Sequence, residues 1–578
     1  MLTLLLLLLG QETIEPRRVF LGTPGDPEWE EFAGETPAGR RLDLKFMSMP
    51  KATTLFLRQE DVKLGWAVEL NGRRLGALHL MEHPLTLALP VSADALKDGE
   101  NILSIVPPKA ADDIRVGEIR LDARPWGTLD VTVTEEGRPV PCRVTVTDVD
   151  GALAPLSGGP GVRPGVFYID GHARVSVPRG TYIVTASRGF EYGIDRVTVE
   201  VVDVRQVSLA IRREVPTPGL VACDTHIHTL EFSGHGDASV EERRLTLAGE
   251  GVELPIVTEH NQHRTYEGGP RFTPIGGNEV TTKKGHFNVF PATGPVPDWK
   301  EERWPELMRS MRASGAQVVI LNHPRDLHSN FRPFDHLEPI TGELKMGGGF
   351  DAVEVINSGA LQSDPMQLFR DWFALLNHGY RVAGVAGSDS HDVARYTVGQ
   401  GRTYVAVDDR DPGNLDVAAA VESFRAGRVQ ACLGLLTKLE RVGEEVEVTV
   451  LGPSWVRADR VELYVNGVRL RELSFTSGPD VEKFRRRWRI PRLKHDAWMV
   501  AVASGPGVRE AFGAIPKPYK PRSKAWEPRV LGSSPVLWLG TKSPRKTARG
   551  ILATLGKDPE KLRRMYEDID EAVAAQLS

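Results

Sequence analysis

The histidines of this chain gather in one part of the sequence. Eleven of the 15 histidines lie between His226 and His391. The segment Asp224-Thr-His226-Ile-His228 ends an apolar run that is typical of a strand. Because residues i and i+2 of a strand point to the same side, both imidazoles can reach one metal ion. Asp224 has the same parity, so we expect its carboxylate to orient one of these histidines.

Two further motifs follow the first pair of histidines. The glycine-rich run FSGHGDAS carries His235 and Asp237, where the backbone can fold close to an ion. One of the two is expected to be a ligand, and His235 is preferred. The run TEHN ends the next strand, and His260 is the expected ligand there. On a regular strand Glu259 points to the opposite face.

The remaining candidates lie further along the chain. Glu279 and His286 occur in GGNEVTTKKGHFNVF, and this carboxylate is suited to bridging two ions. His323 ends the hydrophobic run VVILNHP, and Asp389 and His391 end VAGSDSH with the i, i+2 spacing.

These candidates are too many for one ion. One ion takes about four to six ligands, so the set predicts two or three ions. Mixed imidazole and carboxylate ligands suit Zn, Mn or Fe better than Ca or Mg alone. Counting His235 rather than Asp237, the nine candidates are His226, His228, His235, His260, Glu279, His286, His323, Asp389 and His391.

The elements between residues 220 and 435 are expected to position these side chains. Apolar strands alternate there with helical segments, expected at 239–252, 301–315 and 364–379. Repeated βα units predict a parallel sheet covered by helices, and so many units favour a barrel. In such barrels the active site lies at the carboxyl ends of the strands, where most of the candidates fall.

The ordered motifs DTHIHT, TEHN, NHP and GSDSH resemble those of the PHP (polymerase and histidinol phosphatase) metallohydrolases. The CehA/McbA-like branch, named for a carbaryl hydrolase, is the most similar. The resemblance covers about residues 220–435 and implies a distorted (β/α)7 TIM-like barrel with a two- or three-metal site. Carried over by motif, the implied metal-binding residues are His226, His228, His260, Glu279, His286, His323, Asp389 and His391.

The chain departs from the family pattern at two positions. Glu259 stands where the family has aspartate, and this longer carboxylate is expected to act in catalysis from beside the ligands. The usual loop aspartate is offset, which leaves the choice between His235 and Asp237 open.

The lead hypothesis for function is a metal-dependent hydrolase that cleaves a phosphoester. Bound metal lowers the pKa of water towards about 7, so a metal-bound hydroxide is the expected nucleophile. Asp389 is expected to accept a proton, and Arg325 in NHPRD to clamp an anionic substrate. Surface ion pairing is the other interpretation of Arg325, as it is of Arg332, Lys283 and Lys284. Glu354 and Asn357 in EVINSG are expected to line the pocket.

Two alternatives remain open. The CehA/McbA-like resemblance implies ester, amide or carbamate hydrolysis. A protein of another class would keep the metals for structure only and bind glycan or envelope material.

The 578 residues suffice for about three to five domains. A net charge of −5 argues against nucleic acid as a partner, and three cysteines exclude a disulfide scaffold. Residues 482–549 carry 17 Lys and Arg against 4 Asp and Glu, which indicates either a patch for an anionic partner or a solvated strand face. The predicted segments are a signal peptide at 1–18 with export, a galactose-binding-like jelly roll at 19–125, a carboxypeptidase-regulatory-like sandwich at 126–215, the barrel at 218–438, a β module at 439–535 and a helical tail at 541–578.

Overall fold

The structure is a computed structural model of the chain. It describes residues 11–25, 27–326, 332–338, 342–361, 364–490, 497–518 and 527–540. The chain forms two compact units. The first takes its described residues from 1–187, 194–211 and 509–526, and the second from 188–193, 212–508 and 527–578.

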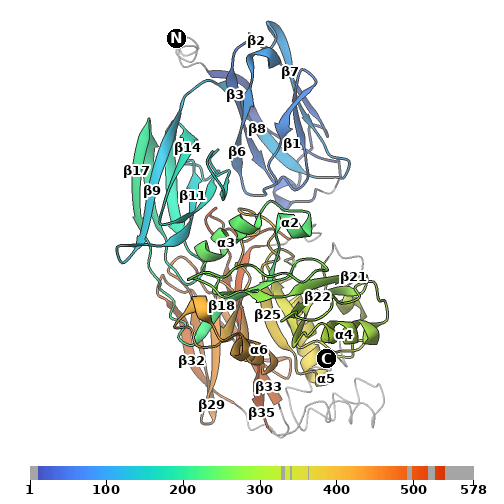
Figure 1. The fold of residues 1–578 in the computed structure, drawn as a ribbon. Helices are drawn as coiled ribbons and strands as arrows, with labels where there is room; N and C mark the ends of the chain where they lie inside the picture. The colour runs from blue at the N-terminus through green and yellow to red at the C-terminus, as the bar shows by residue number, and fades with distance from the viewer. Residues whose placement is uncertain are drawn as a thin grey trace. The chain divides into compact units, whose positions relative to one another are not determined.

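The first unit consists of four β-sheets (Figure 1). Two of them are four-stranded and antiparallel, with the orders β1 (Gln11–Leu21), β8 (Ile114–Asp122), β3 (Thr53–Glu60), β6 (Leu85–Val91) and β2 (Leu42–Ser48), β7 (Gly99–Val106), β4 (Ala67–Leu70), β5 (Arg73–Ala77). The third is β10 (Arg138–Pro139), β9 (Trp126–Glu135), β14 (His172–Pro178), with β17 (Val204–Ala210) parallel to β9. The fourth is β12 (Val162–Arg163), β13 (Val166–Asp170), β11 (Pro141–Thr147), β15 (Gly180–Ser187), β16 (Asp195–Val201).

Turn chemistry explains where several of these strands reverse. Asn71 and Gly72 both have positive φ, at 53° and 79°, and connect β4 to the antiparallel β5. Glu136 and Gly137 do the same between β9 and β10, with φ of 50° and 77°. Glycine and asparagine tolerate this left-handed conformation, which matches the twist of a hairpin.

The second unit holds the histidine-rich segment and three sheets. The largest has the order β20 (Ile275–Gly276), β19 (Leu254–Val257), β18 (Leu220–Ile227), β26 (Arg402–Ala406), β27 (Val429–Leu433), β34 (Arg529–Ser533), β33 (Ala497–Pro506), β30 (Arg460–Val465), β31 (Val468–Ser474), with β35 (Leu537–Leu539) also on β33. The second has the order β21 (Asn278–Thr282), β22 (Gly285–Phe290), β23 (Val318–Asn322), β24 (Ala352–Asn357), β25 (Ala383–Gly387). The third is β28 (Leu436–Val442), β29 (Glu445–Leu451), β32 (Glu482–Arg489).

The predicted (β/α)7 TIM-like barrel of the PHP type is wrong. Its strands fall into two separate sheets, and β18–β26, β26–β27, β21–β22 and β22–β23 pair antiparallel, whereas repeated βα units pair in parallel. In the described residues the α-helices are also too few for seven βα units: α2 (Leu230–Ser233), α3 (Val240–Gly249), α4 (Trp304–Ala313), α5 (Gln367–His378) and α6 (Val417–Arg425).

Three of these helices, α3 to α5, lie where helical segments were predicted, with tighter bounds. A capping box starts α3: the Glu242 backbone N–H donates to Ser239 Oγ at 3.2 Å, and the Ser239 N–H donates to Glu242 Oε2 at 3.0 Å. Gly379, in the left-handed conformation at φ 97°, ends α5. Local residues thus define the start of α3 and the end of α5.

One hydrophobic core joins the two larger sheets of the second unit. Cys223 of β18 is fully buried in it as a free thiol and packs there as a small hydrophobe. Because strands of both sheets contribute, their carboxyl ends are held at fixed positions. The core includes Val221, Cys223, Leu254, Ile256, Val318, Ile320, Ala352, Val385, Val405 and Phe424.

The basic stretch is largely neutralised where the structure describes it. On β32, Arg485 and Arg487 approach Glu447 of the neighbouring β29, and Arg489 approaches Glu444. These exposed pairs form a solvated strand face, which is the second of the two interpretations above.

Two predictions concern the ends of the chain. Residues 1–10 and the predicted tail 541–578 lie outside the described residues. The strand β1 begins at Gln11, inside the segment predicted as a signal peptide, and pairs with β8. Among the described residues, no helix is both long and apolar enough to span a membrane.

Glu253→Gln should flatten the pH dependence of unfolding. Glu253 Oε2 accepts a hydrogen bond from the Ala222 N–H of β18 at 2.9 Å, and burial raises the pKa of Glu253 from 4.5 to about 7. The stability from its bound proton is present below pH 4.5 and is lost as the pH rises through about 7. Glutamine cannot ionise, so the variant should be more stable than the wild type by about 2 kcal/mol at pH 8.

Thermal unfolding, followed by circular dichroism between pH 5 and pH 8, measures the stability of both proteins. The difference in stability between the wild type and Glu253→Gln should be smaller at pH 5 than at pH 8. Glu267→Gln changes an exposed carboxylate and serves as the control. Parallel loss of stability in the wild type and Glu253→Gln over this range would show that Glu253 does not carry the effect.

Candidate metal centre

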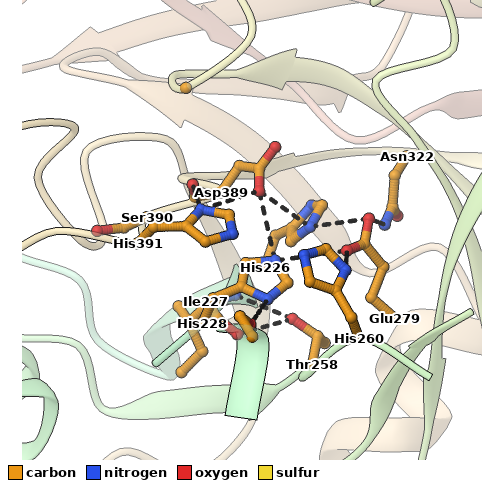
Figure 2. Close-up of polar contacts among 12 residues, drawn as sticks. His226, Ile227, His228, Thr258, His260, Glu279, Asn322, Asp389, Ser390 and His391 are labelled. Carbon is orange, nitrogen blue, oxygen red and sulfur yellow. Dashed lines mark hydrogen bonds and ion pairs between the residues drawn. The ribbon is translucent and has the colours of Figure 1, made fainter. Parts of the chain in front are cut away.

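The histidine motifs meet where the two larger sheets of the second unit come together. Figure 2 shows His226 and His228 beside His260, Glu279, Asp389 and His391. Two isolated bridges join the segments, one between Ile227 and Ser390 and one between His260 and Glu279. The sheets thus contact each other through the residues that carry, or adjoin, the candidate ligands.

The strand ends are tied to one another by short polar contacts. Thr258 Oγ accepts from the Ile227 N–H at 3.0 Å and donates to the Ile227 carbonyl at 3.1 Å. These contacts hold the end of β18 against the end of β19. The side chains of His226 and His228, on either side of Ile227, therefore have a fixed backbone beneath them.

Three groups of potential ligand atoms can be distinguished among the described residues. Within each group all the ligand atoms lie within 4.8 Å of one another, which is the spacing a shared ion requires. The groups are His228, His260 and His391; His226, Glu279 and His323; and His226, His228 and Asp389. Since His226 and His228 each belong to two groups, the three positions form one connected cluster.

Glu279 is the most highly connected of these residues. Its carboxylate is almost fully buried, and Asn322 Nδ2 donates to Oε1 at 3.1 Å. Five imidazoles lie around it, with nitrogen–oxygen distances of 3.2, 3.5, 2.7, 3.2 and 3.5 Å for His226, His228, His260, His286 and His323. This geometry suits the predicted bridging role, because each oxygen faces a different set of imidazoles.

Asp389 is held at the cluster by a strained backbone. Its φ is 55°, in the left-handed region, and His323 has a φ of 22°. Such conformations cost about 1–3 kcal/mol each for residues other than glycine and persist only where the surroundings enforce them. Asp389 Oδ1 lies 3.3 Å from His226 Nε2 and 3.4 Å from His228 Nε2.

The charge states of the cluster differ between its members. Although burial opposes it, the neighbouring carboxylates raise the pKa of His226 and His260 above 6.5 and that of His323 to about 9. Burial, joined by the neighbouring imidazoles of His391 and His260, holds the pKa of His228 well below 6.5. Burial also lowers the pKa of His391 to about 3. Burial alone would raise the pKa of Glu279, but the surrounding imidazoles hold it well below 4.5. Neutral imidazoles and ionised carboxylates are the forms that bind metals.

Unsatisfied atoms in the cluster test whether the residues fit an ion. His226 Nε2, His228 Nε2, His391 Nε2 and Glu279 Oε2 are buried and make no hydrogen bond. Buried polar atoms are almost always paired, so four of them converging here call for a ligand. Imidazole nitrogens with one carboxylate oxygen are the donor set of Zn, Mn or Fe sites.

His235 and Asp237 differ in where their side chains go. The His235 ring stacks on His391 at a centroid distance of 4.2 Å and lies 5.3 Å from His260, although it is exposed. Asp237 Oδ1 instead accepts from the Val393 N–H at 2.8 Å and so fixes the loop after His391. The geometry therefore favours His235 beside the ions and Asp237 as a loop anchor.

Glu259 reaches the cluster indirectly. Its buried carboxylate accepts hydrogen bonds from Thr229 Oγ at 2.6 Å, Ser233 Oγ at 2.8 Å and the Tyr266 hydroxyl at 2.5 Å. Ser233 Oγ in turn lies 3.1 Å from His228 Nδ1. Because the Ser233 hydroxyl donates its hydrogen bond to Glu259, its oxygen can accept one from the Nδ1–H of His228. The Nε2 atom of His228 is then left free to bind an ion. No contact to a reacting group supports the predicted catalytic role.

The cations predicted near the substrate are engaged elsewhere. Arg325 forms a bidentate ion pair with Asp371 at 2.5 and 2.9 Å, and a third donor lies 3.3 Å from Asp335. Arg332 pairs with Asp335 at 2.9 Å. These pairs match the ion-pairing interpretation, so the geometry does not support Arg325 as a substrate clamp. Lys283 likewise pairs with Glu302 at 3.2 Å.

Asp224 does not orient a ligand imidazole, contrary to the parity argument. Its buried carboxylate accepts from the backbone N–H groups of His226, Ser388 and Gly399 at 3.1, 3.0 and 2.6 Å. Asp224 thus fixes the backbone on both sides of the cluster rather than an imidazole ring.

Sequence reasoning also missed Arg243, which nothing in the run EERRL distinguishes. Its guanidinium is fully buried on α3. Nε donates to the His228 carbonyl at 3.0 Å, and the two terminal nitrogens donate to Ser390 Oγ and its carbonyl at 3.0 and 2.9 Å. One side chain therefore joins the two backbone segments that carry His228, Asp389 and His391.

Ser233→Ala should weaken metal binding without unfolding the protein. The change leaves His228 Nδ1 and Glu259 Oε2 without their shared partner, so the His228 ring is no longer held. Removing such a supporting contact typically lowers metal affinity about 10–100-fold. Competition with a metallochromic chelator measures the affinity for Zn or Mn. Ser474→Ala, at an exposed position of β31, is the control, and equal affinities for the two variants would contradict this role.

Comparisons with known proteins do not identify the chain. No protein-family model and no curated protein matches it. Among solved structures, the Bacillus anthracis TIE protein matches 37% of this chain and 43% of its own length, with 11% identity and a TM-score of 0.12. The FMN-binding β-glucuronidase of Facaelibacterium prausnitzii L2-6 shows 11% identity over 86% of this chain and 96% of its own, with a TM-score of 0.19. The exo-chitosanase CsxA of Amycolatopsis orientalis shows 11% identity over 90% and 79%, with a TM-score of 0.23. TM-scores this low do not establish a shared fold.

Proposed function

We propose that this protein is a metal-dependent hydrolase that cleaves a phosphoester at a centre of two or three divalent ions. The observation that carries the proposal is the cluster of three overlapping ligand groups. Four buried atoms of this cluster that could bind a metal ion make no hydrogen bond. The ordered motifs that supply these residues in the sequence support the same chemistry. Zn, Mn or Fe would be held by His226, His228, His260, Glu279, His323, Asp389 and His391.

Such ions would lower the pKa of a water molecule towards about 7 and polarise the phosphoryl oxygen. The chain's own residues then have separate tasks. Glu279 fixes the imidazoles around it from a buried position, and its side chain is only 1% exposed. Asp389, whose side chain is 18% exposed, can reach a substrate, and its carboxylate is the candidate acceptor of a proton. His286 and His260, at 20% and 23%, line the same accessible side.

Ester, amide or carbamate hydrolysis is the second candidate, and one observation favours it. Arg325, Arg332 and Lys283 are each paired with a carboxylate of the same chain. A phosphoester with free negative charge would be expected to use such cations, whereas a carboxylic ester or amide needs none. The same ligand cluster serves either reaction, because both require activation of water and of a polarised oxygen.

Metal content and turnover on one sample separate these candidates. Elemental analysis of protein purified without chelator gives the number of ions per chain. Bis-p-nitrophenyl phosphate and p-nitrophenyl acetate then report phosphoester and carboxylester cleavage. Two or three ions with chelator-sensitive phosphodiester turnover would support the lead proposal. Ions with ester turnover alone would favour the second candidate, and ions without turnover on any substrate would contradict both.

His226→Ala and Asp389→Asn should each abolish turnover. His226 belongs to two of the three ligand groups, and Asp389 faces both His226 and His228. We expect kcat to fall by at least about 10³-fold, as is usual when a group that acts with others in one catalytic unit is removed. Steady-state kinetics with excess Zn or Mn measure the loss. His172→Ala, at an exposed histidine of β14 that pairs with Asp130, controls for the loss of an imidazole. Full turnover by either site variant would refute the proposal.

A further inference from the structure

Glu354 is a buried carboxylate that belongs to none of the three ligand groups. It lies on β24, within the apolar segment Ala352–Asn357, and its side chain has no exposed surface. Burying an ionised carboxylate is costly unless hydrogen bonds compensate for the lost water. The contacts of Glu354 must therefore explain why this strand contains a carboxylate.

The hydrogen bonds of this carboxylate all lead to the metal centre, as far as the described residues show. Oε1 accepts from His226 Nδ1 at 2.9 Å. Oε2 accepts from the backbone N–H of His323 at 2.8 Å and from Asn357 Nδ2 at 2.9 Å. Asn357 Nδ2 also lies 3.4 Å from Asp389 Oδ2. One carboxylate thus reaches, directly or through Asn357, candidate ligands that lie on β18 and just after β23 and β25.

The contact with His226 decides which imidazole nitrogen can bind. An ionised carboxylate only accepts hydrogen bonds, so Nδ1 must carry the proton. The lone pair of His226 is then on Nε2, which faces Glu279 at 3.2 Å and Asp389 at 3.3 Å. A hydrogen bond of this kind fixes the ring orientation and increases the basicity of the binding nitrogen.

The contact with His323 restrains a strained backbone. His323 has a φ of 22°, which few residues other than glycine adopt, and its N–H is held by Glu354 Oε2. Without this acceptor, the buried N–H would lose its partner and the residue could relax. The imidazole of His323 would then move from its place 3.5 Å from Glu279.

Gly387 packs closely against both Glu354 and His226. A Cβ atom added at Gly387 of β25 would lie 2.8 Å from Glu354 Oε1 and 2.8 Å from the Cβ of His226. Glycine at this position therefore lets the carboxylate approach the imidazole. The spacing of β24 and β25 is thus matched to the hydrogen bond between Glu354 and His226.

We propose that Glu354 is a positioning residue that sets the ion affinity of the two ligand groups containing His226. It does so by holding the proton of His226 on Nδ1 and by fixing the backbone of His323. The remaining group, formed by His228, His260 and His391, does not contain His226, and the structure shows no contact between it and Glu354 among the described residues. The inference rests on the metal centre of the proposed function but not on the reaction it catalyses.

Glu354→Gln tests this role because an amide cannot accept at both ends. Whichever way the amide lies, its NH2 group faces either His226 Nδ1 or the His323 N–H. We expect affinity for Zn to fall about 10–100-fold at the ion positions that use His226. The affinity of the position formed by His228, His260 and His391 should stay unchanged. Titration with a metallochromic chelator should then show ions released in two separated phases. In the variant, only the phase that releases the ions held by His226 should move to a lower chelator concentration.

Gly387→Ala provides a second variant that keeps the charge of Glu354. Its methyl group would displace the carboxylate from His226, so the same ions should be weakened. Gly159→Ala is its matched control, because a Cβ there meets nothing within 4 Å. Glu462→Gln, at a buried carboxylate on β30 that pairs with Arg460 and Arg469, controls for the loss of a buried charge.

A second readout separates positioning from general stability. In Zn-loaded protein, a His226 Nδ1–H bonded to a carboxylate should give a slowly exchanging, downfield proton resonance in NMR spectra. His226→Ala assigns this resonance, and Glu354→Gln should shift or remove it. Glu462→Gln should leave both the resonance and the ion affinities unchanged.

The proposal is overturned if Glu354→Gln keeps wild-type affinity at every ion position, or if all positions weaken equally as in general destabilisation. If Glu354→Gln fails to fold, Gly387→Ala decides in the same way. Selective loss of ions in a protein whose wild type cleaves no substrate would support the positioning role while contradicting the proposed function.

Discussion

The burial of Glu279, with Asp389 beside it among imidazoles, is the constraint on which the rest of the site depends. Removing a carboxylate from water costs several kcal/mol unless opposite charge or hydrogen bonds compensate. At Glu279 the neighbours are five imidazoles and the amide of Asn322, which donates to Oε1. An imidazole nitrogen that carries a lone pair cannot donate to a carboxylate, so these neighbours compensate for its burial only in part. Divalent ions between these groups would satisfy both the carboxylates and the lone pairs.

This arrangement requires exact placement of several backbone segments, and buried polar side chains provide it. Asp224 binds three backbone N–H groups, and Arg243 binds the carbonyls of His228 and Ser390. Each of these side chains spans segments more than 140 residues apart in the sequence. Both side chains form hydrogen bonds with backbone groups rather than with candidate ligand atoms. The loops therefore have support that does not depend on bound ions. Glu354 and Glu259 then orient individual imidazoles on this fixed frame.

The sequence predicted the members of the cluster better than its scaffold. Spacing was sufficient for His226 and His228, because a strand places i and i+2 on one side whatever sheet it joins. The same rule failed for Asp224, and for Glu259 it gave the face but not the contact. Asp224 turned to backbone N–H groups, and Glu259 reached His228 through Ser233, a residue whose hydroxyl carries no pattern in the sequence. Parity fixes the face of a side chain but not the partner it finds there.

The barrel failed for a related reason. Alternating strands and helices predicted parallel pairing, but the pattern does not state which strands pair. The segment 278–290 folds into the antiparallel hairpin of β21 and β22, and β26 pairs antiparallel with β18. Lys283 and Lys284 mark the turn of that hairpin, yet without an Asn-Gly or Asp-Gly pair the turn was not recognised. The hairpin matters for the site because it brings Glu279 and His286 to the cluster from adjacent strands.

The cluster is graded in its access to solvent, and this grading suggests how its parts divide the work. His226, Glu279 and His323 have side chains that are 0%, 1% and 5% exposed, and Glu354 beneath them is also fully buried. His260 and His391 of the three-imidazole group are 23% and 17% exposed, and His235 stacks on His391 from outside. The partly exposed side chains are the ones that a substrate in solvent can contact. An ion at the deep, carboxylate-rich position would therefore hold the two sheets together at the site, while an ion nearer the surface would meet the substrate. His226 belongs to the deep group and also shares Asp389 with His228. The hydrogen bond that His226 donates to Glu354 therefore affects both the deep position and the position nearer the surface.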